Sequence, residues 1–173
     1  SQMQTYEGVR AMYEAYSRNK YQSTGVIQWM LNNAWPSMIW HLYDYYMRPG
    51  GGYFGAKRAM EALHPIYGYD DHSIWVVSSQ YEDVKGLKLT TKIYNLDMTE
   101  KFTQENPVDA AADSTAKIFP LPDIDGLSPT YFLALRLQDS AGKLVGSNFY
   151  WLSTKPETLD WAKTTWWMTP TSS

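Results

Sequence analysis

The sequence lacks cysteine altogether, which excludes disulfides, zinc bound by cysteine and catalysis by a thiol. It also lacks any apolar run near the roughly 20 residues that a membrane-spanning helix needs, so we expect no membrane partner. Neither sign of charge prevails, since 15 lysines and arginines stand against 18 aspartates and glutamates, and the basic residues are scattered singly. This pattern argues against a nucleic-acid partner.

Aromatic side chains are abundant, at 16% of residues, within a hydrophobic content of 44% that is enough for a packed core. Tryptophans, tyrosines and asparagines cluster between Gly25 and Ala59. Flat amphipathic rings beside amides suit a ligand with apolar ring faces and hydroxyl edges. We therefore expect this stretch to form one wall of a sugar-binding cleft.

The first third of the chain has the pattern of an α/β protein. Apolar side chains recur at three- and four-residue steps as far as Arg18, which predicts a helix with Thr5 as its N-cap. Gly25 to Leu31 is a short apolar run, typical of a strand buried on both faces. The spacing permits a turn or two of helix from Trp35 to Tyr46, and it predicts an amphipathic helix from Phe54 to Leu63.

The later part of the chain has the pattern of an antiparallel β-sandwich. The period changes from 3.6 to 2, and turn signals arrive about every ten residues. Alternation is clean from Leu87 to Tyr94, so we expect one face of that strand to lie in solvent. The predicted strands are His72 to Ser79, Leu87 to Asn95, Glu100 to Thr103, Thr115 to Phe119, Thr130 to Gln138 and Val145 to Leu152.

One long motif carries a family resemblance. GVIQWMLNNAWPSMIWHLYDYYMRPGGGYFGAKRA, followed by a sandwich pattern, resembles the end of the catalytic barrel in glycoside hydrolase family 2. Within that family it is most similar to the exo-β-D-glucosaminidases, with the β-mannosidases behind them. TYEGVRAMYEAYSRNKY is similar to the seventh barrel helix, LTTKIYNLDMTEKF to a strand pair of the sandwich, and NFYWLSTKPETLDW to the end of an immunoglobulin-like domain.

The resemblance implies an α/β segment followed by an all-β domain. Residues 1–66 would be the C-terminal segment of a (β/α)8 barrel, with its last strand and helices. Residues 67–163 would be an immunoglobulin-like β-sandwich, and residues 164–173 a tail or linker. Ser1 leads directly into the first helix pattern, so we expect a fragment of a longer protein.

The implied activity is that of a retaining exo-β-glycosidase that releases β-linked glucosamine from chitosan oligosaccharides, or acts on a mannose-type substrate, without a cofactor. In the family both catalytic glutamates precede the position of Ser1, so we expect no catalytic residue here and an inactive chain. The expected partner is the rest of the enzyme or a second copy, and the implied location is extracellular or periplasmic. A non-catalytic carbohydrate-binding or structural immunoglobulin-like module stays open as an alternative.

The resemblance assigns substrate contacts to four residues at the end of the predicted strand. Trp29 would lie on the floor of the sugar pocket, although a tryptophan packed inside the barrel explains it almost as well. Asn32 and Asn33 would end the strand where barrel enzymes bind ligands. Asn33 stands where β-mannosidases tend to have aspartate, which leaves a neutral hydrogen-bonding group. Trp35 would close one side of the pocket or plug the loop from beneath.

Other polar residues are given structural roles. Glu7 and Glu14 are two helical turns apart, roughly 10 Å, and we expect them in solvent. His41 and Asp44 are three residues apart, and a structural hydrogen bond explains them better than catalysis. The histidines and carboxylates lack the grouping of a metal site, so no metal is predicted.

The remaining features are expected to shape the fold. Gly50 to Gly52 is interpreted as a flexible connection, and Asp70 with Asp71 as turn residues at the domain junction. Five tryptophans could form a carbohydrate-binding platform on the sandwich: Trp75, Trp151, Trp161, Trp166 and Trp167. We expect Trp75 and Trp151 to belong to the core instead, and the other three to cover a sheet edge or the barrel junction.

Overall fold

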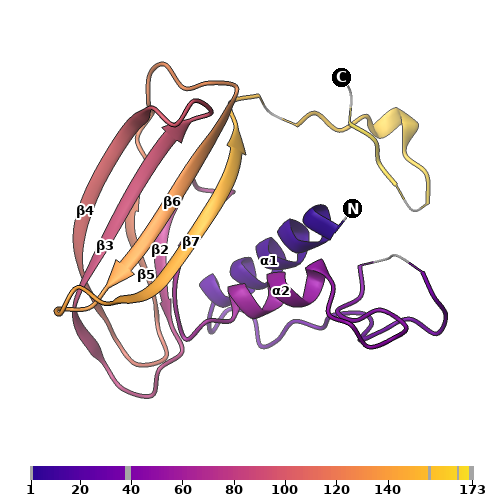
Figure 1. The fold of residues 1–173 in the computed structure, drawn as a ribbon, viewed down its shortest axis with the longest axis horizontal. Coiled ribbons are helices and arrows are strands. Elements are labelled where there is room, and N and C mark those ends of the chain that lie inside the picture. The colour runs from indigo at the N-terminus through magenta and orange to yellow at the C-terminus, as the bar shows by residue number, and fades with distance from the viewer. Residues whose placement is uncertain (1, 38–39, 156, 167, 172–173) are drawn as a thin grey trace.

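A computed structural model of the chain describes residues 2–37, 40–155, 157–166 and 168–171. Two helices lie against one edge of a β-sandwich, and a long loop extends beyond the helices on the side away from the strands (Figure 1). The last described residues leave the sandwich after its final strand and carry one short 3-10 helix, Trp161–Lys163. Trp167 lies outside the described residues.

The sandwich consists of two antiparallel sheets that enclose one hydrophobic core. In the described residues one sheet has the order β1-β2-β5 and the other the order β4-β3-β6-β7. The core side chains come from both sheets, and Ile74, Ile93 and Leu133 are fully buried. The strands are β1 Leu63–Tyr67, β2 Ser73–Ser78, β3 Val84–Asn95, β4 Glu100–Ala110, β5 Thr115–Pro120, β6 Thr130–Gln138 and β7 Leu144–Ser153.

All six predicted strands are present, and β6 has the predicted bounds. The burial of β3 alternates as expected only in part: Leu89 is fully buried beside the exposed Lys88, but Thr90, expected to face solvent, is 8% exposed. Sequence reasoning missed β1, because its five residues contain Pro65 and show no alternation. β1 lies at the edge of its sheet, where a proline without an N–H is tolerated.

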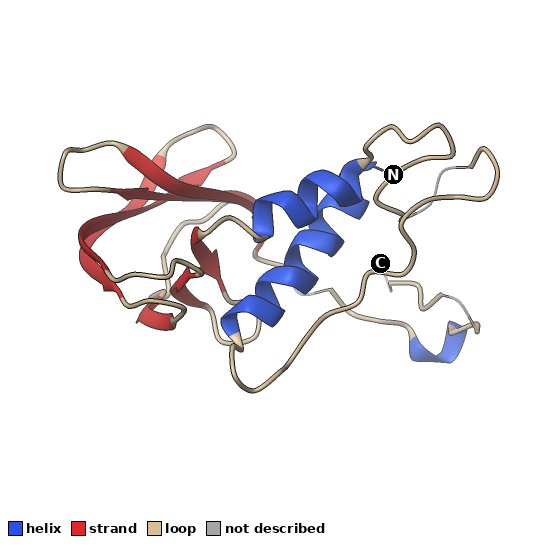
Figure 2. Cartoon of the chain, turned by 90° about the horizontal axis from the view of Figure 1, so that it is seen from below, coloured by secondary structure: helices blue, strands red, loops and turns tan. Residues whose placement is uncertain are grey.

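Helices α1 (Gln2–Arg18) and α2 (Gly51–Ala59) pack side by side and run parallel (Figure 2). A Cβ at Gly51 or Gly55 would lie 2.0 Å from the carbonyl oxygen of Gln2 or 2.4 Å from that of Tyr6, so these glycines permit the close approach. Among the described residues no helix is long and apolar enough to cross a bilayer.

These helices correct three predictions. Residues 51 and 52 begin α2 and pack against α1, so the glycine run is not simply a flexible connection. The second helix ends at Ala59 and not at Leu63, because the chain turns into β1. Thr5 is not the N-cap of α1, which begins at Gln2.

The predicted buried strand at Gly25–Leu31 is wrong for this chain. The stretch forms no strand, and Ile27 and Trp29 expose 86% and 71% of their surfaces. A strand buried on both faces needs neighbouring strands, and the described residues supply none beside it. The predicted helical turn from Trp35 to Tyr46 is also not observed at its described positions, which lie in a loop; residues 38 and 39 lie outside them.

A buried polar cluster joins α1 to the sandwich. Glu14 exposes only 2% of its surface, which contradicts the expectation that it faces solvent. Its Oε1 lies 2.9 Å from Nε2 of His64 in β1 and accepts a hydrogen bond of 2.7 Å from Nδ2 of Asn148 in β7. Its Oε2 accepts a hydrogen bond of 2.8 Å from the hydroxyl of Tyr150. The carboxylate therefore binds side chains from both sheets.

Arg10 also belongs to this junction cluster and links it to the partly exposed Glu7. Its guanidinium donates to Oδ1 of Asn148 at 3.0 Å and to the carbonyl oxygen of Phe149 at 2.5 Å, and it pairs with Glu7 at 2.5 Å. It also lies over the ring of Tyr150, with Cζ 4.4 Å from the centroid. Arg10 is 1% exposed and Glu7 about one-third exposed, so the expectation of a solvated Glu7 holds only in part.

The end of α1 is tied to the sandwich by a second group of charges. Arg18 pairs with Asp70 at 2.6 Å and with Asp71 at 3.2 Å, and its guanidinium lies over the ring of Trp75. Asp71 also accepts a hydrogen bond from the backbone N–H of Ser73. The prediction that Asp70 and Asp71 make turns at the domain junction fits these contacts.

Candidate functional site

Backbone hydrogen bonds fold the loop between the helices, residues 19–50, back on itself. The N–H of Tyr43 donates to the carbonyl oxygen of Leu31 at 3.0 Å, and the N–H of Gly50 donates to that of Leu42 at 2.9 Å. Tyr43 thereby forms isolated bridges with both Asn32 and Pro49. These contacts place the end of the predicted strand beside the beginning of α2.

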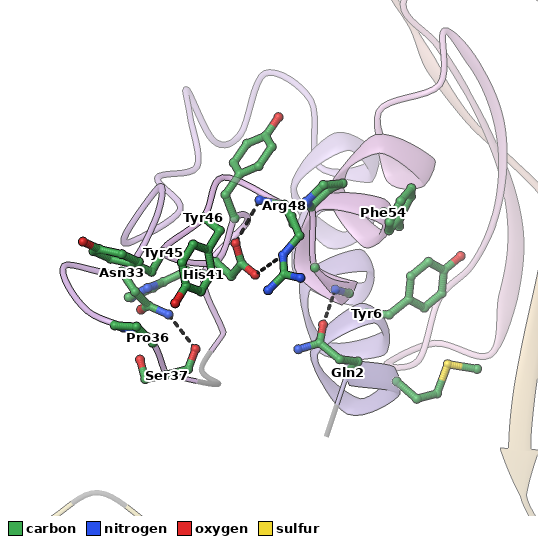
Figure 3. A pocket seen from close by; sticks show the side chains of 16 residues that line it. Gln2, Tyr6, Asn33, Pro36, Ser37, His41, Tyr45, Tyr46, Arg48 and Phe54 are labelled. Atoms are coloured by element: carbon green, nitrogen blue, oxygen red, sulfur yellow. Dashed lines mark hydrogen bonds and ion pairs between the residues drawn. The ribbon is translucent and has the colours of Figure 1, made fainter.

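A hollow of about 810 Å³ lies where this loop meets the N-terminal ends of both helices (Figure 3). Oε1 of Gln2 accepts a hydrogen bond from the N–H of Gly51 across one end of it. Sequence reasoning did not foresee the wall formed by Gln2, Tyr6 and Phe54. The glycines from Gly50 to Gly52 were the available signal, because glycines at the start of a helix permit close packing against another helix. Closely packed parallel helices begin at the same end, which brings the first residues of α1 and α2 together. The other lining residues are Met3, Asn33, Pro36, Ser37, His41, Tyr43, Asp44, Tyr45, Tyr46, Arg48, Pro49, Gly50 and Gly51.

Two buried polar side chains form part of the wall. Asn33 is 7% exposed, and its Nδ2 donates to the carbonyl oxygen of Ser37 at 3.0 Å. His41 is 6% exposed, and its ring meets that of Trp40 edge to face. Nδ1 of His41 has no hydrogen-bond partner among the described residues. A buried polar atom without a partner is costly, so this wall is suited to further polar contacts.

Asp44 is held by Arg48 and not by His41. Its Oδ1 accepts a hydrogen bond from the backbone N–H of Arg48, and its Oδ2 accepts one from the side-chain Nε–H of the same residue, both at 2.9 Å. The backbone hydrogen bond, with the guanidinium, holds the pKa of Asp44 below its usual value. The predicted structural role for Asp44 fits this turn, although its partner differs from the one that the sequence suggested.

Of the four predicted substrate contacts, Asn33 alone lines the hollow. Trp29 and Trp35 expose 71% and 68% of their surfaces, and neither borders it. Asn32 is half-buried, and its Nδ2 lies 3.4 Å from the carbonyl oxygen of Asn33. The carbonyl oxygen of Trp29 accepts a hydrogen bond of 2.6 Å from the indole of Trp40. The structure therefore brings Asn32 and Asn33 together and leaves the two tryptophans pointing outward.

The described lining residues favour binding over chemistry. Asp44 is the one carboxylate among them, whereas retaining glycoside hydrolysis uses two carboxyl groups about 5 to 5.5 Å apart. In the described parts of the chain, no three histidines, aspartates or glutamates are grouped as metal ligands would be. Rings, amides and one ion pair can orient a polar ligand with apolar faces.

Comparison with known proteins relates the whole chain to glycosidases. Residues 70–155 match the family model of the mannosidase Ig/CBM-like domain. An exo-β-D-glucosaminidase from Streptomyces avermitilis is 46% identical over 100% of this chain and 20% of its own length. The solved exo-chitosanase from Amycolatopsis orientalis is 44% identical, with a TM-score of 0.87 over 99% of this chain and 21% of that chain.

A β-D-mannosidase from Dictyoglomus thermophilum shares the fold, with a TM-score of 0.72 over 86% of this chain and 18% of that chain, at 22% identity. The sandwich is thus a domain of the mannosidase Ig/CBM-like type, matched over residues 70–155. More narrowly, the chain belongs to glycoside hydrolase family 2 as a C-terminal part of the exo-β-D-glucosaminidase group. It spans about a fifth of the length of these relatives.

Proposed function

We propose that this chain is the C-terminal segment of a retaining exo-β-glycosidase that releases β-linked glucosamine from chitosan oligosaccharides. In the intact enzyme it closes a (β/α)8 barrel and supplies contacts to the terminal sugar from Trp29, Asn32, Asn33 and Trp35. The observation that carries the proposal is similarity along the entire chain to proteins named exo-β-D-glucosaminidases.

The arrangement of the helices supports the barrel assignment. Consecutive helices of such a barrel run parallel, with a strand between them in the sequence. α1 and α2 run parallel with close contacts, and residues 25–31 lie between them in the sequence. The apolar side chains of this stretch are open, since Ile27 exposes 86% of its surface and Leu31 56%. Neighbouring barrel strands would cover them and complete the predicted strand.

The same assignment gives the hollow a place on the catalytic face. In barrels of this type, ligands bind on the loops that follow the strands, at the end where the helices begin. The hollow lies at the beginnings of α1 and α2, and Asn33 follows the predicted strand. Further polypeptide beside the loop would turn Trp29 and Trp35 from exposed side chains into cleft walls. A purely structural module leaves these exposed tryptophans without a role.

A chimaera tests the proposal. This chain would replace the matching segment of the Streptomyces avermitilis exo-β-D-glucosaminidase, and hydrolysis of a chromogenic β-glucosaminide would be measured. We expect an active chimaera in which Trp29→Ala or Asn33→Ala lowers kcat/KM about tenfold or more, since each tenfold loss is about 1.4 kcal/mol of transition-state binding. Trp161→Ala, an exposed tryptophan in the tail, is the control and should leave kcat/KM unchanged.

The isolated chain should not hydrolyse the substrate, because its partners in catalysis lie on other polypeptide. Appreciable turnover by the chain alone would refute the placement of both catalytic glutamates outside it. A folded chimaera in which none of the four substitutions at Trp29, Asn32, Asn33 and Trp35 alters kcat/KM would refute the sugar contacts. We also propose an extracellular or periplasmic location for the parent enzyme, which fractionation of the source cells would check.

A further inference from the structure

The outer face of the larger sheet carries a row of aromatic side chains. Tyr94 of β3 lies opposite Phe132 of β6, and Phe132 lies opposite Trp151 of β7. Directly opposed residues of antiparallel strands point to the same face. Their chain neighbours Ile93, Leu133 and Tyr150 are fully buried, so these three rings point away from the core.

Phe149 joins the row at the edge strand and completes what we call the aromatic platform: Tyr94, Phe132, Phe149 and Trp151. The ring of Phe132 stacks on that of Phe149, with centroids 5.4 Å apart, and meets that of Trp151 at 5.9 Å in an edge-to-face contact. Despite these contacts Trp151 exposes 59% of its surface and Phe149 50%. The prediction that Trp151 belongs to the core is therefore wrong.

The described residues leave the platform open. α1 and α2 pack against the edge strand through Arg10, which binds the carbonyl oxygen of Phe149, and through Arg58, which donates to the hydroxyl of Ser147 at 2.8 Å. The tail leaves the end of β7 and runs to the side of the sandwich on which the helices lie, as Figure 1 shows. Exposed large apolar groups that touch one another are unusual on a sheet face in water and indicate a binding surface.

The exposed area is too small for a protein partner. Trp151 and Phe149 are about half exposed, and Tyr94 and Phe132 are less so. An aromatic side chain offers about 200 Å², so the four rings together present roughly 300 Å². A specific protein interface needs about 800 Å² from each partner. The row crosses three strands, a length of about 10 Å, which matches the flat faces of a disaccharide unit.

The charges around the platform select among saccharides. The strand register places charged residues of both signs on the outer face, among them Lys88, Lys92, Arg136, Glu100, Glu105 and Asp109. Lys92 pairs with Glu100 at 2.7 Å, and Lys88 pairs with Glu105 at 3.1 Å. The face is thus balanced and locally paired, so neither a polycation nor a polyanion gains from it.

We propose that the aromatic platform is a second sugar site, which binds a chain of uncharged β-1,4-linked pyranoses such as N-acetylglucosamine units. It is separate from the hollow beside α1 and α2, and it does not depend on the proposed hydrolysis. Apolar sugar faces stack on the rings, while hydroxyl and amide edges reach the polar side chains beside them. A substrate that contains both N-acetylglucosamine and glucosamine units would bind to the sandwich through its uncharged N-acetylglucosamine stretches.

The test titrates the 173-residue chain with the hexamer of β-1,4-linked N-acetylglucosamine, followed by calorimetry. We expect saturable binding that Trp151→Ala weakens at least tenfold and that the control Trp161→Ala leaves unchanged. Both tryptophans are largely exposed, so neither substitution should alter the thermal midpoint. The hexamer of glucosamine, measured at pH 5.5 where its amines are charged, should bind more weakly than the N-acetylated one.

Four results would contradict this proposal, and each points to a different explanation of the platform. No saturable binding, or binding that Trp151→Ala does not affect, overturns the platform as a sugar site. Binding lost in Trp29→Ala and kept in Trp151→Ala places the sugar on the loop and leaves the proposed hydrolase standing. Tighter binding of the glucosamine hexamer contradicts the reasoning from charge. Self-association that Trp151→Ala abolishes, seen by sedimentation, makes the platform a contact between copies.

Discussion

Replacement of Glu14 by glutamine tests how the helices are joined to the sandwich. The carboxylate accepts hydrogen bonds from Asn148 and Tyr150 at 2.7 and 2.8 Å, and it lies 2.9 Å from Nε2 of His64. All three neighbours present hydrogen toward it when His64 is protonated. Glutamine keeps the shape of the side chain but replaces one acceptor by a donor, so at least one contact is lost and another is opposed.

The charge balance of the junction cluster sets the magnitude. Burial alone would lower the pKa of His64, but the carboxylates of Glu14, at hydrogen-bond distance, and of Glu61, 3.6 Å from Nδ1, outweigh burial and raise it. Burial likewise opposes the charge of Arg10, and Glu14 offsets that effect. Removal of one partner from a buried ion pair typically costs 3 to 5 kcal/mol. Because Glu7 and Glu61 remain nearby, we expect about 3 kcal/mol, or roughly 6 to 12 °C in thermal midpoint for a chain of this size.

The cluster also predicts how stability depends on pH. The folded chain binds the proton of His64 more tightly than the unfolded chain does, because its pKa is raised from 6.5. This stabilisation is complete below the unfolded pKa of about 6.5 and is lost as pH rises through the higher folded pKa. The thermal midpoint should therefore fall as pH rises above about 6.5. Glu14→Gln should flatten this fall, because Glu14 is a principal cause of the raised pKa.

Thermal unfolding followed by circular dichroism from pH 5.5 to 8.5 measures both effects. Glu105→Gln is the matched control, since it makes the same substitution in an exposed ion pair with Lys88 and should leave the midpoint nearly unchanged. His64→Gln should remove the same pH dependence. If Glu14→Gln lowers the midpoint no more than Glu105→Gln does, the cluster does not hold the junction. If the fall above pH 6.5 persists in His64→Gln, another group titrates.

Two further predictions concern the helices. Gly55→Ala should lower the free energy of unfolding by several kcal/mol, because its Cβ would meet the backbone oxygen of Tyr6 at 2.4 Å, whereas Gly8→Ala has open space and should raise it by up to about 1 kcal/mol. Equal effects of the two substitutions on urea unfolding would contradict the close packing of α1 on α2. Arg18→Gln should lower the free energy of unfolding by about 1 to 2 kcal/mol, mainly because a buried guanidinium no longer stacks on the ring of Trp75. Arg48→Gln, in an exposed pair with Asp44, should scarcely change the midpoint, and the same outcome for Arg18→Gln would refute the reasoning.

The sandwich could be predicted well because its strands carry their own signal. Alternation along β3 shows which side chains enter the core, and turn residues separate the strands. β1 carries no such signal, since all five of its residues are buried and one is Pro65. Its place depends on pairing with β2, which brings Pro65 opposite Val76. That pairing is a long-range property that periodicity along one segment does not reveal.

The first third of the chain was predicted less well for a different physical reason. The apolar run at 25–31 is a strand by pattern, but a strand needs neighbours to satisfy its backbone groups. The candidate site was found in part, because Asn33 follows that run and the aromatic residues are dense around it. The contributions of Gln2, Tyr6 and Phe54 depend on how the two helices pack, and Trp29 and Trp35 stay predictions.

The domain boundary predicted from the sequence cuts through the contacts that stabilise the junction between the helices and the sandwich. A division near residue 66 falls inside β1 and separates Glu14 from Asn148. Apart, the helices would expose Arg10 and Glu14 without their partners in β7, and the sandwich would lose most of β1 and leave Asn148 with unsatisfied polar atoms at its edge. The cost of such buried groups is several kcal/mol. The helices and the sandwich therefore stabilise each other through this junction cluster.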